Sequence, residues 1–294
     1  DTGTALTIDN DAGGTAIADA AVRGLTFANY ATSSIGGSSV TIKADGGLTL
    51  SKTQADAMKA AGVKIDTGTA LTINNDGGST ALSDADVQAI ATGASNYATT
   101  SLGGSGVTVT TDGALNLTIA QADGLRTNSV GLDGAAAITL AADVAGTAIV
   151  DGTIRALTFG NYRTTDLGGT SVTIKADGAL SLSKTQADAM RTAGVKIDTG
   201  TALSIDNDGA GTAIADATIR GLTLANYNTT NLGGSGVTIK TDGAISLTAA
   251  QADAIRGEGS VLLDSAAVII LDNDAGGTAI ADAAIQGLTY GNYR

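Results

Sequence analysis

Short clusters of Asp and Asn followed by Gly are the residues of this chain best suited to chemistry. Asp9-Asn10-Asp11-Ala12-Gly13-Gly14 recurs at residues 206–211 and 272–277. Oxygen ligands on a backbone that Gly allows to curl suit Ca²⁺, although the bidentate Glu of an EF-hand is missing. These loops are therefore candidate calcium sites. The candidate calcium ligands are Asp9, Asp11, Asp76, Asp206, Asp208, Asp272 and Asp274.

A structural interpretation of the same loops competes with calcium binding, and we favour it. An Asp beside a turn accepts hydrogen bonds from nearby backbone N–H groups without any metal. The pattern is also incomplete in two copies, because Asn74 replaces the first Asp in one and Ala141-Ala142 removes two oxygen ligands in the other. The aspartates that persist in all five copies are Asp11, Asp76, Asp143, Asp208 and Asp274.

Two further polar rows recur once per repeat. One is an Asp early in a predicted helix, which we expect to be solvated or to favour the positive end of the helix dipole. Its members are Asp56, Asp123, Asp188 and Asp253. The other is an Asn-Tyr pair, first seen at 29–30, whose Tyr we expect to be half-buried with a solvated hydroxyl. The Thr/Ser runs that follow, such as Thr32-Ser33-Ser34, are predicted to be solvated loops.

Composition excludes several kinds of chemistry. The chain has no His and no Cys, which removes imidazole bases, thiol nucleophiles, disulfides and zinc fingers. Its net charge of −13 opposes binding to nucleic acids and anionic membranes. No stretch approaches the roughly 20 apolar residues of a membrane span. Glu258 is the only Glu, and Asp prefers turns, caps and cation sites.

An internal repeat positions these residues. The unit DTGTALTIDNDAGGTAIADAAVRGLTFANY is copied with variations from Asp1, Asp66, Asp133, Asp198 and Asp264. The predicted repeats are residues 1–65, 66–132, 133–197, 198–263 and, in part, 264–294. Such a unit buries its apolar face only against its neighbours, so we predict one continuous body over residues 1–294.

Each full repeat divides into two related half-units, and both contain two short predicted strands. A V-x-I triplet such as 40–42 is followed by a Leu-Thr-apolar triplet such as 48–50, and both alternate with the period of a strand with one buried face. Asp-Gly pairs such as Asp45-Gly46 separate the two in the first half-unit. We interpret them as bends rather than hairpin turns, because stacked related halves favour parallel pairing.

Helices are predicted after the strands. Ser51-Lys52-Thr53-Gln54 is a capping box that recurs at 118–121, 183–186 and 248–251, with Met58 facing inward and Gly62 ending the helix. A weaker, short helix is expected in the other half-unit, where apolar pairs such as Val22/Leu25 lie three residues apart.

The predicted fold is therefore α/β, a strand-plus-short-helix solenoid with a parallel sheet. It contains about 4.5 repeats of 65–67 residues, each of two half-units, in the manner of a leucine-rich-repeat or β-solenoid protein.

The repeats resemble those of giant secreted bacterial surface proteins and adhesins. The segments that carry the resemblance are VKIDTGTALTI, VTIKADGALSLSKTQADAM from Val172, and Leu247-Thr248-Ala249-Ala250-Gln251. This resemblance implies type I secretion, an extracellular location at the bacterial cell surface and, frequently, calcium.

We predict a structural protein rather than an enzyme, because every repeat resembles the others and catalysis needs a singular site. It is expected to form a subunit or segment of a surface fibre, sheath or surface layer. Neither terminus looks capped, so the expected partner is a second copy stacked head to tail or the continuation of a longer chain. The alternative is an adhesin arm that binds surface glycans through Thr rows at Thr41, Thr49 and Thr72.

Overall fold

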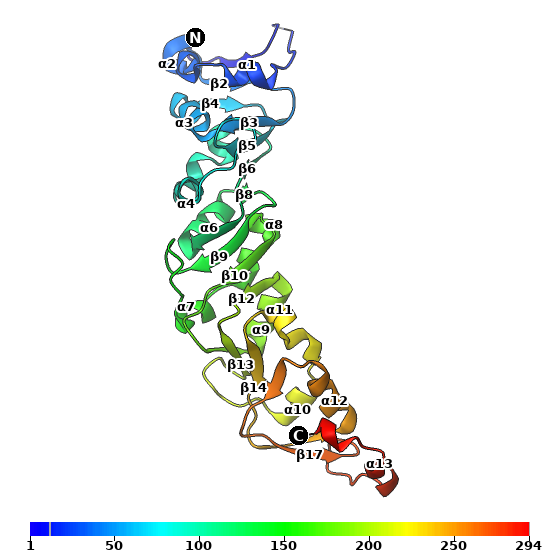
Figure 1. Ribbon diagram of the computed structural model, residues 1–294. Coiled ribbons are helices and arrows are strands. Elements are labelled where there is room, and N and C mark those ends of the chain that lie inside the picture. The colour runs from blue at the N-terminus through cyan, green and yellow to red at the C-terminus, as the bar shows by residue number, and fades with distance from the viewer. Residues whose placement is uncertain (12, 294) are drawn as a thin grey trace. The chain divides into compact units, whose positions relative to one another are not determined.

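The computed structural model describes residues 1–11 and 13–293 as an α/β protein of repeated strand–helix units (Figure 1). Its backbone forms two compact units. Unit 1 comprises residues 1–146 and 161–172, and unit 2 comprises residues 147–160 and those from 173 onward. The division falls inside the 3-10 helix η3 (Phe159–Tyr162) and strand β10 (Ser171–Ile174). The continuous solenoid over residues 1–294 concerns both units together and stays a prediction.

Strands and short helices alternate along unit 1. Its strands are β1 (Ala5–Ile8), β2 (Ser39–Ile42), β3 (Leu48–Ser51), β4 (Val63–Ile65), β5 (Ala70–Asn74), β6 (Gly106–Val109), β7 (Ala114–Thr118), β8 (Val130–Leu132) and β9 (Ala137–Ala141). Its helices are α1 (Asp19–Arg23), η1 (Phe27–Tyr30), α2 (Thr32–Ile35), α3 (Lys52–Ala61), α4 (Asp84–Thr92), η2 (Ala94–Asn96), α5 (Thr99–Leu102), α6 (Ile119–Thr127) and α8 (Thr164–Leu167).

Unit 2 repeats the same order of elements. Its strands are β11 (Leu180–Ser183), β12 (Val195–Ile197), β13 (Ala202–Asp206), β14 (Gly236–Ile239), β15 (Ala244–Thr248), β16 (Val261–Leu263) and β17 (Val268–Asp272). Its helices are α7 (Asp151–Arg155), α9 (Lys184–Ala193), α10 (Asp216–Arg220), η4 (Leu224–Tyr227), α11 (Thr229–Leu232), α12 (Ala249–Gly257), α13 (Asp282–Gln286) and η5 (Tyr290–Asn292).

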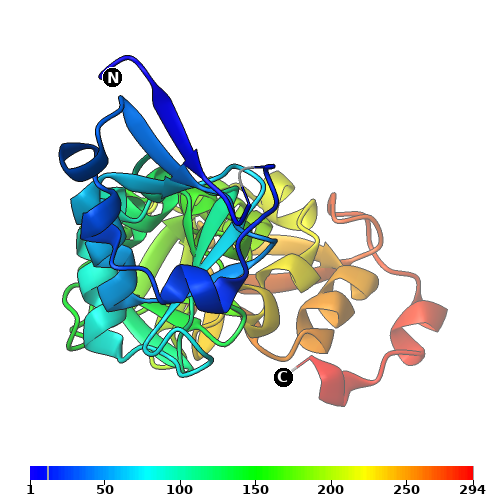
Figure 2. The same cartoon turned by 90° about the horizontal axis from the view of Figure 1, so that it is seen from above.

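The strand pairs within each unit are parallel, which confirms that prediction. In unit 1, β1 pairs with β2 and β3 pairs with β5 (Figure 2 shows β1 and β2 at the N-terminal edge). The strands β2 and β3, which Asp45-Gly46 connects, belong to different sheets. The Asp-Gly pair is therefore a bend between two sheets, as predicted, and Gly46 adopts a positive φ of 146°.

Each four-stranded sheet joins strands of two kinds. In unit 1 the order is β3-β5-β6-β8, with Leu71 of β5 aligned between Leu48 of β3 and Val107 of β6. The first two are Leu-Thr-apolar strands and the last two are V-x-I strands; β3 belongs to the first repeat, whereas β5, β6 and β8 belong to the second. Unit 2 has the same arrangement in β11-β13-β14-β16. Consecutive repeats thus share a sheet, a change of strand partner that the sequence did not indicate.

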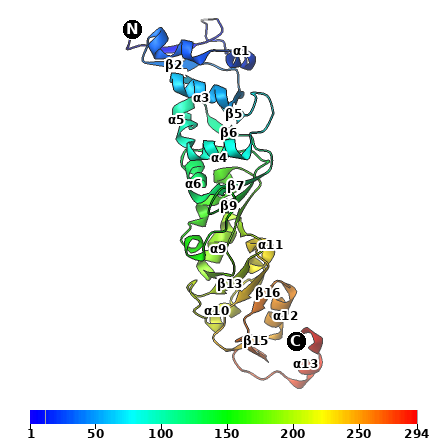
Figure 3. The same ribbon diagram turned by 60° about the vertical axis from the view of Figure 1, so that its left-hand side comes forward.

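The capped helices complete the core. Leu48 and Leu50 of β3, Met58 of α3 and Val63 of β4 are fully buried, as the period-2 and helical patterns predict. Figure 3 shows α3, α5 and α6 beside strands β5, β6 and β7 of unit 1. The capping boxes are present at the N-terminal ends of α3, α6, α9 and α12, and Gly62 and Gly194 end α3 and α9 in the left-handed conformation.

The Thr/Ser runs are helical turns rather than the loops that we predicted, although Ser33, Ser34 and Thr100 are exposed as expected. Residues 32–35 form the helical turn α2, and residues 99–102 form the turn α5. The third residue of each turn donates its hydroxyl to a backbone carbonyl group of the preceding 3-10 helix. The Ser101 hydroxyl donates to the Ser95 carbonyl oxygen (2.7 Å), and Ser34 does the same to Ala28 (3.0 Å).

The edge strands of the interior sheets are covered by other segments of the same repeats. On the edge strand β3, Arg23 of α1 lies 3.5 Å from the Thr49 carbonyl oxygen, and in the next repeat Gln88 donates to the Asn116 carbonyl oxygen (2.9 Å). The other edge strand of this sheet, β8, is covered by a Gly-Gly turn, since Gly169 N–H donates to its Leu132 carbonyl oxygen (3.2 Å). Gly104 N–H makes the equivalent bond to the Ile65 carbonyl oxygen of β4 (3.1 Å) in the sheet β1-β2-β4. Covered edges cannot recruit other strands.

The Gly-Gly turn has no room for a side chain. A Cβ atom on Gly103 would lie 2.1 Å from the Ile65 carbonyl oxygen, and the φ of Gly103 is +79°. We predict that Gly103→Ala lowers the free energy of unfolding by roughly 3 kcal/mol, because both backbone strain and a backbone clash must be relieved. Urea unfolding followed by circular dichroism measures the change.

Gly106→Ala is the matched control. Gly106 begins β6 three residues later, and a Cβ atom there would meet nothing within 4 Å. Its free energy of unfolding should stay within about 0.5 kcal/mol of the parent. Equal losses for the two variants would contradict the close approach of the turn to β4.

Candidate functional site

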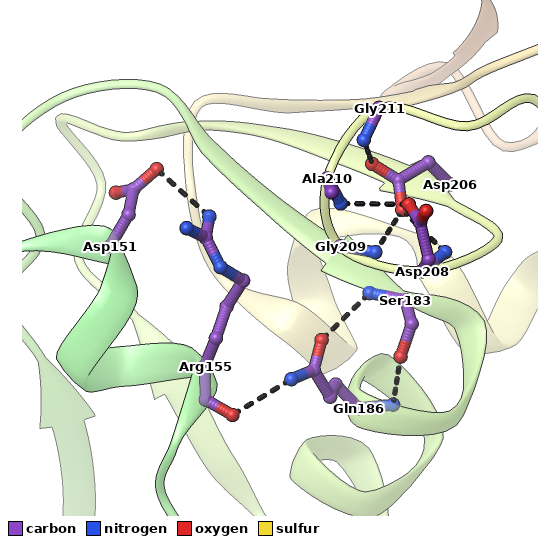
Figure 4. Close-up of polar contacts among 9 residues, drawn as sticks. All are labelled: Asp151, Arg155, Ser183, Gln186, Asp206, Asp208, Gly209, Ala210 and Gly211. Carbon is purple, nitrogen blue, oxygen red and sulfur yellow. Dashed lines mark hydrogen bonds and ion pairs between the residues drawn. The ribbon is translucent and has the colours of Figure 1, made fainter.

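The predicted calcium loops are closed by hydrogen bonds from their own backbone. In unit 2 the Asp206 side chain is fully buried at the end of β13 and accepts from the backbone N–H groups of Asp208 (3.0 Å), Gly209 and Gly211 (2.7 Å) (Figure 4). Both carboxylate oxygens of Asp206 therefore already have partners. This geometry places an acceptor side chain inside a ring of backbone donors, so its hydrogen-bonding capacity is used without a cation.

Asp208, the loop Asp that is present in all five copies, also accepts hydrogen bonds from its own loop. Asp208 accepts from Ala210 N–H (2.8 Å), Thr212 N–H (3.2 Å) and the Thr212 hydroxyl (2.6 Å). The Thr hydroxyl and these backbone donors lower the pKa of Asp208 below its ordinary value. The equivalent hydrogen bonds lower the pKa values of Asp11, Asp76 and Asp274.

The remaining predicted ligands lie in separate, equivalent loops. Asp272 repeats the geometry of Asp206 by accepting from Ala275 and Gly277 N–H groups, and Asn74 does so from Gly77 N–H (2.6 Å). Asp9 is half-buried after β1. Among residues 1–11 and 13–293, no three acidic side chains are grouped so that they could hold one metal ion. Calcium binding stays a prediction, and the contacts are those of the structural alternative.

A melting experiment tests calcium directly. If the loops bind Ca²⁺ in the folded state, excess Ca²⁺ must raise the midpoint of thermal unfolding, because a ligand of the folded state alone stabilises it. The contacts above lead us to expect no rise beyond that of a matched ionic strength of NaCl. This control is essential, since any salt screens the repulsion within a chain of net charge −13. A specific rise with Ca²⁺ would establish the metal sites.

A second row of carboxylates ties neighbouring half-units together, and sequence reasoning missed its role. Asp66, which opens the second repeat, accepts from Ala44 N–H (3.1 Å) in the preceding half-unit and from its own Thr69 hydroxyl (2.8 Å). Asp198 makes the same pair of contacts to Ala176 and Thr201. The recurrence of an Asp at the start of every copy was the available signal.

The capping-box Gln has a further role beyond the cap. In α9, the Gln186 side chain accepts from Ser183 N–H (2.9 Å) through Oε1 and donates through Nε2 to the Arg155 carbonyl oxygen (2.8 Å) at the end of α7 (Figure 4). Gln54 and Gln121 bridge in the same way to Arg23 and Gln88. One amide therefore caps its own helix and also bonds to a backbone carbonyl group of the α-helix in the preceding half-unit.

The helix aspartates pair with the tyrosines of the following repeat. Asp56 of α3 accepts from the Tyr97 hydroxyl (2.6 Å) and from the Lys52 ammonium (2.9 Å). In unit 2, Asp188 accepts from Tyr227 (2.8 Å) and Lys184 (2.8 Å). Both tyrosines are almost fully buried. The prediction of a solvated hydroxyl was therefore wrong for Tyr97 and Tyr227, because each meets a partner distant in sequence. The Asp56 side chain stays 46% exposed, and its tyrosine partner was not predicted.

Burial and the neighbouring carboxylate hold these tyrosines neutral. Burial, with the adjacent Asp56, raises the pKa of Tyr97 to about 12, and burial with Asp123 raises the pKa of Tyr162 to about 12. A raised folded-state pKa contributes stability that is complete below the ordinary value of 10.0 and is lost as the pH rises toward 12.

We predict that the free energy of unfolding falls between pH 10 and pH 12 and that Tyr97→Phe reduces this dependence. At neutral pH the variant should lose about 1 kcal/mol, the usual contribution of one hydrogen bond. Tyr30→Phe, at the equivalent position of the first repeat, is the control and should change stability by less than about 0.5 kcal/mol. Urea unfolding across this pH range measures both. A flat profile for the parent chain would contradict the Asp–Tyr contact.

Two carboxylates at helix starts are less well accommodated. Burial raises the pKa of Asp19 and that of Asp151, and the neighbouring Asp45 and Asp177 of the Asp-Gly bends raise them further. Arg155 lies only 3.5 Å from Asp151 and compensates in part (Figure 4). Asp19 and Asp151 begin α1 and α7, the helices that cover the edge of a sheet. Covering the edge therefore brings a carboxyl group close to the strand backbone.

The predicted Thr rows follow the strand register. Thr49, Thr72 and Thr108 are aligned on β3, β5 and β6, and all three are partly exposed. Thr41 aligns with Thr7 on one side and with Lys64 on the other. These hydroxyls form short rows that end at β4 and β8, where Lys64 aligns with Thr41 and Gly131 with Thr108.

These sites share one property: their polar groups bond to backbone or to the next half-unit, and the same contacts recur in successive repeats. Within residues 1–11 and 13–293, none of the helices has the length and apolar character needed to cross a lipid bilayer. No protein-family model, curated protein or solved structure matches the chain.

Proposed function

We propose that this protein is a non-enzymatic structural repeat protein of the bacterial cell surface. In this proposal the repeats wind as a solenoid and form a subunit or segment of an extracellular fibre, sheath or surface layer. The observation that carries the proposal is the recurrence of the same inter-half-unit contacts, made by Asp66, Gln54 and Tyr97 and by their equivalents. A catalytic site needs one arrangement that differs from the rest.

The polar groups support a structural role because they hold repeats together. Asp66 joins two half-units through one carboxylate oxygen, Gln54 joins two helices, and Tyr97 joins consecutive repeats. Stability in such an array is a sum of repeat and interface terms, so length can grow without a larger core. The resemblance of the VTIKADGALSLSKTQADAM segment to repeats of secreted surface proteins supports the extracellular location.

Assembly by the full chain tests the proposal. Purified protein at physiological ionic strength should form fibres or sheets in electron micrographs as its concentration rises, since salt screens the repulsion between chains of net charge −13. Sedimentation velocity on the same samples should show species larger than one chain. Dispersed single chains at the highest concentration would contradict self-assembly.

A glycan-binding adhesin arm is the second candidate, and the aligned hydroxyls of Thr49, Thr72 and Thr108 favour it. Replacing the three with Val would remove the hydroxyls while keeping the strand shape. Loss of binding to a surface glycan in the triple variant would support this function, whereas absence of binding by the parent chain across a glycan array would count against it.

A further inference from the structure

A polar pocket in unit 1 lies between helix α6, strand β8 and the helical turn α8. These three elements contact one another, and all three are labelled in Figure 1. The pocket has a volume of about 410 Å³, which is in the usual range of small-molecule sites. The side chains that define its chemistry are Thr108, Arg126, Ser129, Thr164, Thr165 and Asp166.

Ser129 occupies a position where the first and third repeats have glycine. Its φ is 52°, and its equivalents Gly62 and Gly194 have φ angles of 68° and 70°. Glycine adopts this conformation freely, whereas a residue with a Cβ atom is strained in it. The strained backbone places the side chain of this exposed serine on the wall of the pocket. Strain of this kind clusters at functional sites.

Gly131 shows the opposite exchange two residues later, in the middle of β8. Its equivalents in β4, β12 and β16 carry long side chains: Lys64, Lys196 and Leu262. Nothing in the backbone requires glycine here, because a Cβ atom on Gly131 would meet only the Val107 carbonyl oxygen, at 3.9 Å. Glycine weakens a strand and often marks the close approach of a ligand. The missing side chain leaves the pocket open beside Thr108, with which Gly131 aligns.

Arg126 brings unused hydrogen-bond donors to the pocket. Its Nη2 lies 3.6 Å from the Asp123 carboxylate, and its Nε has no hydrogen-bond partner among the described residues. The side chain is 34% exposed. A guanidinium has five N–H groups, so donors remain for the oxygen atoms of a ligand.

The combination of these groups selects a neutral ligand that is rich in hydroxyl groups. Arg126 only donates hydrogen bonds, an ionised Asp166 only accepts them, and the four hydroxyls of the pocket do both. An anion would face Asp166 in a chain of net charge −13, and a cation would face Arg126. An apolar ligand would find only Leu132 among the lining side chains.

We propose that this pocket binds one ring of a neutral saccharide, with Arg126 and Ser129 donating to its oxygen atoms and Asp166 accepting from its hydroxyls. The inference goes beyond the structural role and does not depend on self-assembly. It also gives the glycan-binding alternative a site that does not use Thr49 or Thr72. No aromatic side chain lines the pocket, so the Kd for one ring should be roughly millimolar.

A chemical-shift titration of the full-length ¹⁵N-labelled chain measures binding at this affinity. The probes are the methyl glycosides of glucose, galactose, mannose and N-acetylglucosamine, each up to about 50 mM. We expect at least one of them to shift the amide signals of Ser129, Thr164 and Thr165 in a saturable way. The absence of such shifts with every glycoside would overturn the inference. Tighter binding of glucuronate would also contradict it, because the site would then be one for anions.

Two substitutions separate binding from folding, because each should leave the chain at least as stable as the parent. Ser129→Gly removes the hydroxyl and relieves the positive φ, and the Kd should rise about 3- to 10-fold, the usual contribution of one hydrogen bond. Gly131→Leu, which copies the fourth repeat, fills the pocket and should abolish the shifts. Ser79→Gly changes an exposed residue outside the pocket and should keep the parent Kd. An unchanged Kd in Ser129→Gly or in Gly131→Leu would refute the site.

A double variant on the Thr row distinguishes the pocket from the other candidate glycan site. Thr49→Val combined with Thr72→Val leaves the pocket intact, because neither residue lines it. The shifts at Ser129 should persist in this variant. Binding that is lost there but retained in Ser129→Gly would locate the sugar on the row and remove the inference. Electron micrographs report self-assembly separately, so a failure of the proposed structural role is distinguishable from a failure of this site.

Discussion

The structure depends on one constraint: a half-unit of this chain has no interior of its own. Its strands are only three to five residues long and apolar on one face, as in β4 with Val63 and Ile65 inward and Lys64 outward. A single short strand pair is at best marginally stable in water. The parallel register of each half-unit with the next therefore supplies both the backbone hydrogen bonds and the buried surface. The loop aspartates, the edge-covering side chains and the Gly-Gly turns all stabilise that register.

The abundance of Asp and the near absence of Glu follow from the need for short side chains that accept hydrogen bonds from nearby backbone N–H groups. An Asp carboxylate is short enough to accept from amides within its own loop, as Asp208 does, or from the adjacent half-unit, as Asp66 does. A Glu carries one more methylene and would place its oxygens beyond these donors. Asp is therefore used here mainly as a backbone acceptor, and the acidic charge of the chain accompanies that use.

Side chains and glycines share the task of closing the sheet edges. Arg23 and Gln88 reach strand carbonyl groups on one edge, and the Gly-Gly turns lie against the other. Different residues at the equivalent positions 23 and 88 serve the same backbone group, so the requirement is for a donor rather than for a charge.

The candidate site was only partly predictable from the pattern of residues. Asp206 and Asp208 were identified as a closely spaced oxygen cluster, but the calcium and structural interpretations use the same residues. In the structure the Asp206 oxygens accept from the backbone N–H groups of Gly209 and Gly211. The directions of these N–H groups depend on the φ angles of the two glycines, which the residue pattern does not give. The Tyr97–Asp56 pair was unpredictable, because its partners lie 41 residues apart in the sequence.

The sequence by itself determined the repeat, the capping boxes, the Asp-Gly bends and the parallel, one-sided strands. These features arise from local periodicity and from short-range hydrogen bonds, which neighbouring residues specify completely. Only the tertiary structure decided which strand stands beside which. Leu71 lies between Leu48, which is also in a Leu-Thr-apolar strand, and Val107, which is in a V-x-I strand. Both kinds of strand present the same period-2 apolar face, so the pattern cannot distinguish them; the path of the connecting helices and the Gly-Gly turn selects the partner.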